Sequence, residues 1–305
     1  MRGHVGLASA GLVATASFWA VNAIIGRAMV GEIPPLGLAF WRWVLAFLIL
    51  APFGVPAVYR QWSVVRARWK ALVVIATFSV GLFNTLLYIA AQTTTALNIA
   101  MMNATLPIAV AFGAHFVLRE YLNLQRSMGI ALGFLGILVI ITEASFTRLL
   151  TLQFVPGDLV MLSAVASWTL FSVVMRWAAV PLTPIAFLTV QIAFGIPVVA
   201  PFYIGESMLS GAYLPRVEHL WVFAVVAIGP SLLAYALWNN GIKVIGASRA
   251  ALFLYLVPVV AAVLGYLLLD ERLAVFHAIG GVLILLGLTL AVRQQAPDRL
   301  ADKNP

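Results

Sequence analysis

Long apolar runs alternate with short polar or charged breaks along the whole chain. Runs of about 17 to 25 apolar residues are long enough to cross the hydrocarbon core of a bilayer as helices. Ten such runs are predicted, beginning near Gly6, Leu36, Ala71, Ala96, Ser127, Asp158, Pro184, Leu220, Ser248 and Leu273. We therefore expect an all-α polytopic membrane protein with ten transmembrane helices, the first of them a retained helix rather than a cleaved signal peptide.

The second half of the chain repeats the first. With a shift of 151 residues, 96–141 aligns on 247–292 without a gap. The identical positions include a proline, a glutamate and two glycines in each copy: Pro107/Pro258, Glu120/Glu271, Gly129/Gly280 and Gly136/Gly287. Residues of this kind match by chance less often than apolar ones do, so the two copies are expected to share ancestry.

The front halves of the copies align at a shift of 149, which pairs Pro35 with Pro184 but Arg42 with Gln191. Each copy then holds five helices. Because five is odd, the chain enters the second copy from the opposite side of the membrane, and inverted repeats are typical of secondary transporters. The expected units are a first five-helix repeat, a second, inverted repeat and a short cytoplasmic tail: residues 1–145, 146–292 and 293–305.

Composition and charge agree with this interpretation. Of the 305 residues, 63% are hydrophobic and 9% are charged, and the net charge is +8. Most Lys and Arg residues fall in loops on the side of the amino terminus, so both termini are predicted to be cytoplasmic. The basic residues form short clusters between apolar runs, which indicates a lipid bilayer as their partner and no nucleic acid. The chain has no cysteine, so disulfides and cysteine metal sites are excluded.

Several polar and aromatic residues lie inside the apolar runs. Asn84 and Tyr88 stand four residues apart, as do Tyr235 and Asn239, and each pair shares one helix face. The candidates for lining a substrate cavity are Trp19, Asn22, Asn84, Tyr88, Asn98, Met102, Trp168, Ser172, Tyr235, Trp238, Asn239 and Tyr255. The alternative is that these side chains only join or fill the helix bundle.

Arg42 lies one or two turns inside its span, where a buried cation is costly unless it is paired or reaches the headgroups. It is a candidate counter-ion or gating residue, with Glu32, Asp270 or Glu271 as possible partners. Pro107 and Pro258 are candidate hinges, or alternatively static kinks. The remaining Trp residues near span ends are assigned to interfacial belts: Trp41, Trp43, Trp62, Trp69, Trp177 and Trp221.

The pattern of Trp19, Asn22 and Arg27, then Pro35 and Arg42, then the repeated Pro107 to Gly136 block resembles the EamA-type exporters of the drug/metabolite transporter superfamily. Within it, the chain is most similar to bacterial exporters of aromatic amino acids. The resemblance implies a ten-helix inner-membrane carrier, with helices five and ten peripheral and the others around a central cavity. It implies export of aromatic and other partly apolar amino acids by alternating access, without a cofactor.

Other functions remain open at this point. The substrate is alternatively another small metabolite or drug. An intramembrane enzyme would need a nucleophile with a base, or a metal cluster, and no two of His4, His115, His219 and His277 have ligand spacing. A receptor or scaffold would need longer loops. A homodimer through helices five and ten is possible, because Gly129, Gly133 and Gly136 allow close packing.

Overall fold

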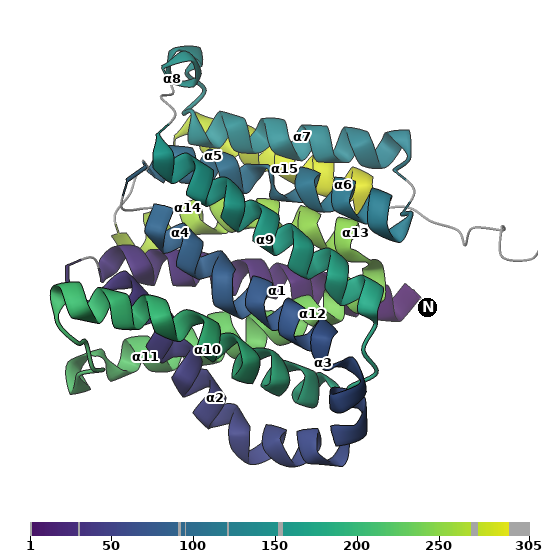
Figure 1. Ribbon diagram of the computed structural model, residues 1–305. Helices are drawn as coiled ribbons and strands as arrows, with labels where there is room; N and C mark the ends of the chain where they lie inside the picture. The colour runs from purple at the N-terminus through teal and green to yellow at the C-terminus, as the bar shows by residue number, and fades with distance from the viewer. Residues whose placement is uncertain are drawn as a thin grey trace, which may run out of the picture.

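The computed structural model describes residues 2–29, 31–90, 93–94, 96–120, 122–151, 155–269 and 274–292. Within these ranges the regular structure is entirely helical (Figure 1). The α-helices of the first half are α1 (Arg2–Ala28), α2 (Pro35–Arg60), α3 (Trp62–Ala76), α4 (Asn84–Ala90), α5 (Ala96–Ala104), α6 (Leu106–Leu118), α7 (Leu124–Ile141) and α8 (Phe146–Leu150). Those of the second half are α9 (Pro156–Ala178), α10 (Pro184–Ser210), α11 (Leu220–Val226), α12 (Ala234–Ile245), α13 (Ala247–Leu252), α14 (Leu256–Leu269) and α15 (Val275–Val292).

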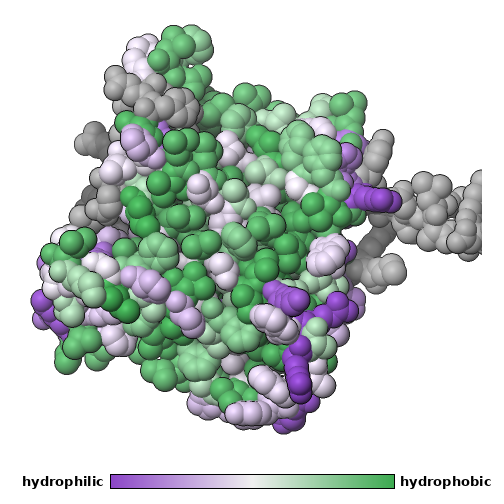
Figure 2. All heavy atoms as spheres, in the orientation of Figure 1, coloured by the Kyte–Doolittle hydropathy of each residue, from purple (hydrophilic) through white to green (hydrophobic). Residues whose placement is uncertain are grey.

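The outer surface of the bundle is apolar. Among the described residues, eight helices are long and apolar enough to cross a membrane, and two shorter apolar helices cover Met102–Leu118 and Val275–Ala291. Large side chains such as Phe53, Phe116 and Leu162 are exposed on this surface. Figure 2 shows a broad hydrophobic band, with strongly hydrophilic residues gathered toward the ends of the bundle. This surface belongs in lipid, so the chain is a multi-pass membrane protein.

Most helices begin within a few residues of the predicted positions, but α3 begins earlier. It begins at Trp62 rather than near Ala71, because the basic segment before Ala71 is also helical. Arg68 has non-helical angles (φ −115°, ψ 15°), which divide that segment from the apolar part of the helix. The charges ended the apolar pattern in the sequence but did not end the helix.

α7 and α15 have bounds that differ by 151 at both ends, and they pack side by side at one edge of the bundle (Figure 1). A Cβ atom on Gly129 would lie 2.6 Å from the carbonyl oxygen of Gly287, and one on Gly136 would lie 2.6 Å from that of Gly280. These reciprocal contacts make the two helices antiparallel. The glycines that suggested a dimer interface are therefore used within the chain, where they let the two backbones approach.

Two matched helices contain seven-residue π-helical segments. The first, η1 (Thr77–Phe83), joins α3 to α4, and the second, η3 (Ala227–Leu233), joins α11 to α12. Pro230 lies inside η3 and lacks a backbone N–H, which disturbs regular helical hydrogen bonding there. Because π-helical turns are frequent at functional sites, both segments indicate a candidate site at the centre of the bundle.

The other matched helices are interrupted just before their prolines. α5 ends at Ala104 and α6 begins at Leu106, so Pro107 stands in the first turn of α6, where its missing N–H has no helical partner to lose. A 3-10 turn, η4 (Phe253–Tyr255), separates α13 from α14, which carries Pro258 in its first turn. The structure thus places a change in helical geometry just before each candidate hinge proline.

Candidate functional site

An aromatic cluster fills the centre of the bundle. Its core is formed by Trp19 of α1, Trp168 of α9, and Tyr235 and Trp238 of α12. The ring centroids of Trp19 lie 5.2 Å from Trp168 and 5.3 Å from Trp238, and Trp168 lies 5.4 Å from Trp238. The edge-to-face and tilted geometries are those that aromatic pairs prefer. We call these four residues the central cluster.

Trp43 of α2 extends the cluster and corrects its assignment to an interfacial belt. Its side chain is fully buried, and its ring packs edge-on against Tyr235 at 4.9 Å. The belt assignment rested on its position near the start of a span, but the helix turns this face inward. Trp62 and Trp177, in contrast, are more than half exposed, as the belt prediction requires.

Arg42 lies beside this cluster, 2% exposed. Its Nη1 donates to Oδ1 of Asn22 at 3.3 Å, and its guanidinium carbon lies 4.8 Å from the centre of the Trp43 ring. Its Nε has no hydrogen-bond partner among the described residues. The ion pairs among the described residues involve Arg126, Arg216 and His219, and Glu32 pairs with His219 rather than with Arg42. Asp270 and Glu271, the other expected partners, lie outside the described residues.

A polar relay contacts the cluster at Tyr235, whose hydroxyl donates to the carbonyl of Ser79. Ser79 of η1 donates its hydroxyl to the carbonyl of Ile75 at 2.6 Å and accepts from Nε2 of Gln191 at 2.9 Å. Nδ2 of Asn239 then donates to Oε1 of Gln191 at 2.8 Å. We call Ser79, Gln191 and Asn239 the relay. It links η1, α10 and α12 through side chains that are all buried.

Carbonyl groups of the two π segments accept hydrogen bonds from the cluster. The Tyr235 hydroxyl donates to the carbonyl of Ser79 at 3.3 Å, and Nε1 of Trp19 donates to that of Pro230 at 3.2 Å. A buried polar group that lacks a partner is costly in a membrane interior. The irregular turns therefore satisfy side chains that a regular helix would leave unpaired.

The other candidates divide into two groups. Asn84 and Tyr88 both lie near the Tyr235 hydroxyl, and Ser172 donates to the carbonyl of Trp168. Met102 is buried in the main core. Tyr255 lies elsewhere: its ring covers Gly133 of α7 and its hydroxyl donates to the carbonyl of Ile130. The side chain of Asn98 lies outside the described residues.

A pocket of about 330 Å³ lies at the end of the bundle opposite to the start of α1, which we call the distal end. It is bounded by α2, α4, α9 and α10, and its lining includes Tyr88, Thr93 and Glu206. The Glu206 carboxylate accepts from the backbone N–H groups of Leu36 and Gly37 at 3.1 and 2.7 Å. An anionic group at a helix N-terminus is stabilised by the helix dipole, so Glu206 holds the start of α2 against α10.

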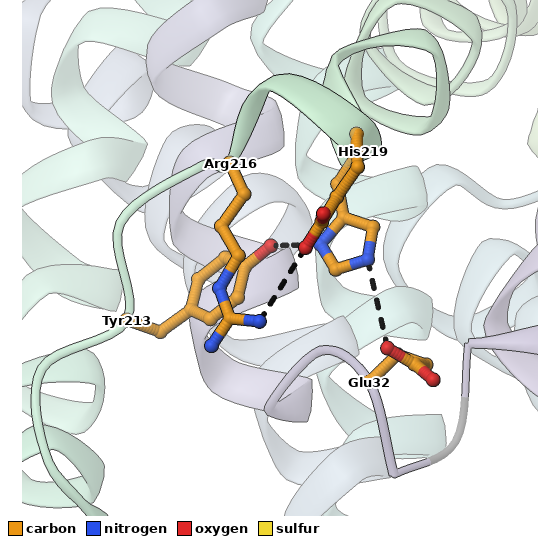
Figure 3. A network of polar contacts seen from close by, with 5 residues as sticks. Glu32, Tyr213, Arg216 and His219 are labelled. Atoms are coloured by element: carbon orange, nitrogen blue, oxygen red, sulfur yellow. Dashed lines mark hydrogen bonds and ion pairs between the residues drawn. The ribbon is translucent and has the colours of Figure 1, made fainter.

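A polar network covers the distal end beside this pocket (Figure 3). Tyr213 and His219 share a hydrogen bond of 2.8 Å, and Nε2 of His219 lies 3.8 Å from the Glu32 carboxylate. Arg216 pairs with Glu218 at 3.4 Å in solvent. Burial raises the pKa of the Tyr213 phenol, so this group stays protonated at neutral pH. The network ties the loop after α1 to the loop after α10.

At the opposite end, a neutral side chain joins α2 to α10. The Thr183 backbone N–H donates to Oε1 of Gln61 at 2.9 Å, and Nε2 of Gln61 donates to the Thr183 hydroxyl at 2.8 Å. Gln61 thus holds the start of α10 as Glu206 holds the start of α2. On the same end, Arg176 donates to the carbonyl of Lys243 at 2.6 Å and joins α9 to α12.

Sequence reasoning missed three residues of this site: Ser79, Gln191 and Trp43. The signal for Gln191 was present, because the repeat alignment sets it opposite Arg42. Its partners were not readable, since a hydrogen bond between α10 and η1 depends on how those helices pack. Serine is a common residue in membrane helices, and only the packing of α10 against η1 gives Ser79 a partner on another helix.

Comparisons with known proteins agree with this architecture. A model of the EamA-like transporter family matches residues 7–142 and residues 155–293. The uncharacterized transporter YyaM of Bacillus subtilis is 28% identical over 269 residues, which cover 88% of this chain and 87% of the relative. A probable amino-acid metabolite efflux pump of Escherichia coli is 26% identical over 184 residues, 58% of this chain and 60% of the pump.

A solved crystal structure superimposes with a TM-score of 0.74 at 20% identity and covers 93% of this chain and 96% of that chain, which shows that the fold is shared. The two relatives named above are described as a transporter and as a probable efflux pump. The family model matches far more than half of the chain in two separate segments. This chain therefore belongs to the EamA-like transporter family.

Proposed function

We propose that the protein is a secondary transporter that exports aromatic and other partly apolar amino acids across the bacterial inner membrane. The observation that carries this proposal is the pairing of an aromatic cluster with a buried cation whose Nε has no partner among the described residues. Trp168 and Trp238 each add an indole N–H that also has no described partner. These groups are all donors, and a carboxylate is an acceptor-only group.

The transport mechanism is proposed to be alternating access by two inverted five-helix repeats, 1–145 and 146–292. Support comes from the two family-model matches, from the antiparallel pairing of α7 with α15 and from the matched π segments. In this arrangement the substrate site lies between the repeats near the middle of the membrane. The changes in helical geometry before Pro107 and Pro258 are suited to hinge motion, because neither proline donates a backbone hydrogen bond there.

The expected orientation sets both termini in the cytoplasm. Arg60, Arg66, Arg68 and Lys70 lie in or beside the first part of α3, at the end of the bundle where α1 begins. Because cytoplasmic loops carry the excess of positive charge, this end is the inner side. The pocket beside Tyr88 and Glu206 then opens toward the outside, and substrate leaves through it.

The proposal is tested with radiolabelled phenylalanine in inverted membrane vesicles, in which an exporter accumulates substrate. We expect Trp168→Ala and Tyr88→Ala to reduce accumulation at least about tenfold, because large aromatics contribute most of the contact area in such a site. Trp177→Ala serves as the matched control, since Trp177 is exposed on the surface.

All variants are quantified in the membrane fraction so that expression is separated from transport. Normal accumulation by both Trp168→Ala and Tyr88→Ala would refute the site. Absence of phenylalanine accumulation by the wild-type protein would refute the substrate, and a panel of small metabolites and drugs then tests the alternative.

A further inference from the structure

The direction of hydrogen bonding in the relay is determined from one end. Ser79 uses its only hydroxyl proton on the Ile75 carbonyl, so it accepts from its other neighbour. That neighbour, Gln191, must then present its Nε2 to Ser79 and its Oε1 to Asn239. A carbonyl oxygen accepts only, so Asn239 must offer its Nδ2 to Gln191. The orientation of both amides follows from the carbonyl of Ile75.

This direction leaves one acceptor at the end of the relay. Oδ1 of Asn239 is turned away from Gln191, is buried, and has no hydrogen-bond partner among the described residues. The whole Asn239 side chain is more than nine-tenths buried. An amide oxygen in such a place lacks a donor, and leaving it unpaired costs free energy. The strongest donor that a small solute can bring is an ammonium group.

The acceptor and the cation Arg42 are connected through Tyr235. The Tyr235 hydroxyl donates to the carbonyl of Ser79, a member of the relay, and lies within electrostatic range of Arg42. The ring of Tyr235 also packs against Trp43, whose own ring lies under the Arg42 guanidinium. Asn239 follows Tyr235 by one turn of α12. The unpaired Nε of Arg42 and the unpaired Oδ1 of Asn239 are therefore both linked to Tyr235, one through Trp43 and the other along α12.

We propose that Oδ1 of Asn239 binds the ammonium group of an α-amino acid, while Arg42 binds its carboxylate. This inference rests on the proposed function and adds to it the position of each charged group. Asn239 follows Trp238 directly on α12, and an aromatic ring beside the acceptor also favours a cation there. The relay holds the acceptor in place, and Gln191 is a positioning residue that does not touch the substrate.

The test measures dissociation constants of purified protein in detergent for three ligands that differ in one group. Phenylalanine has both charges, 3-phenylpropionate lacks the ammonium group and phenethylamine lacks the carboxylate. We expect Asn239→Leu to raise the dissociation constants of phenylalanine and phenethylamine about 10- to 100-fold, because a hydrogen bond to a charged group is lost. Binding of 3-phenylpropionate should change less than about twofold.

Ser248→Ala is the matched control, because it removes another buried oxygen that has no described partner, on α13. Its three affinities should remain those of the wild type. An equal loss for all three ligands in Asn239→Leu, or no loss for phenylalanine, overturns the proposal. If the wild type binds none of the three ligands, the proposed function itself fails, and the two failures are distinguishable.

Asn239→Asp keeps the size of the side chain, adds a negative charge and replaces the donor to Gln191 with an acceptor, so it tests the preference of this site for a cation if Asn239→Leu does not fold. Phenethylamine should bind at least about tenfold more tightly to this variant, and 3-phenylpropionate more weakly, because like charges repel. Affinities equal to those of the wild type for both ligands would contradict the assignment of Asn239.

Discussion

Arg42 and Gln191 occupy the same position in the two halves of the chain, yet they have opposite roles in the structure. Arg42, on α2, is a buried cation with an unpaired donor, supported by Asn22 and Trp43. Gln191, on α10, is neutral and fully bonded on both ends of its amide, and the unpaired group of its network is an acceptor on Asn239. The two halves of the chain match in their helices, but one half carries an unpaired donor at this site and the other carries an unpaired acceptor.

The residues that follow Arg42 and Gln191 also differ: one is aromatic and the other is aliphatic. Trp43 follows Arg42, and Ile192 follows Gln191, and both are fully buried. An aromatic face stabilises a neighbouring cation, whereas an aliphatic side chain only fills space. The difference fits the proposed function, in which two inverted repeats supply a symmetric frame and an amino-acid substrate, with two unlike charged groups, needs an asymmetric site.

The largest effect is expected from Arg42→Gln, which gives the two repeats the same residue at this position. Phenylalanine transport should fall about 10- to 100-fold, since charge-assisted bonds to the carboxylate are lost. Stability should not fall, because a buried cation is costly in the membrane interior. Proteoliposome flux and thermal unfolding in detergent measure the two effects. A parallel loss of stability and flux would mean that Arg42 is structural.

A smaller effect is expected from Gln191→Leu, which removes the centre of the relay. Nδ2 of Asn239 and the Ser79 hydroxyl oxygen each lose a partner, and each unsatisfied buried group costs about 1 to 3 kcal/mol. The thermal midpoint should therefore drop, in contrast to Arg42→Gln. Gln125→Leu is a suitable control, because Gln125 donates one bond, to the carbonyl of Leu290, away from the cluster. An unchanged midpoint in Gln191→Leu would show that the relay is not a structural unit.

The smallest effect is expected from Trp43→Phe, which keeps a ring under Arg42 but weakens its attraction for a cation. Trp is the best partner for a cation and Phe is weaker, with whole interactions of about 0.5 to 2 kcal/mol. Phenylalanine flux should change by about two- to fivefold. Trp177→Phe on the exposed surface should leave flux as it is. A Trp43→Phe loss as large as that of Arg42→Gln would place Trp43 itself against the substrate.

Much of the fold could be predicted from the sequence, but less of the site could be predicted. Apolar run length predicted where helices begin, and the repeat alignment paired α7 with α15, whose bounds differ by the predicted shift. Trp43 was assigned to the membrane interface but is fully buried, and Tyr255 lies against α7 rather than in the central cluster. In a membrane helix both faces are apolar, so periodicity does not distinguish the face toward lipid from the face toward the bundle.

The sequence by itself determined that the solvent is lipid, that the chain is helical and that it is built from two copies, because composition, run length and repeated letters carry this information. Only the tertiary structure decided which polar atoms are paired. The π segments free backbone carbonyls, α10 brings Gln191 to Ser79, and the carbonyl of Ile75 then sets the direction of every bond as far as Asn239. Hydrogen bonds between distant residues depend on packing distances and amide orientation, and the pattern of residues along the chain predicts neither.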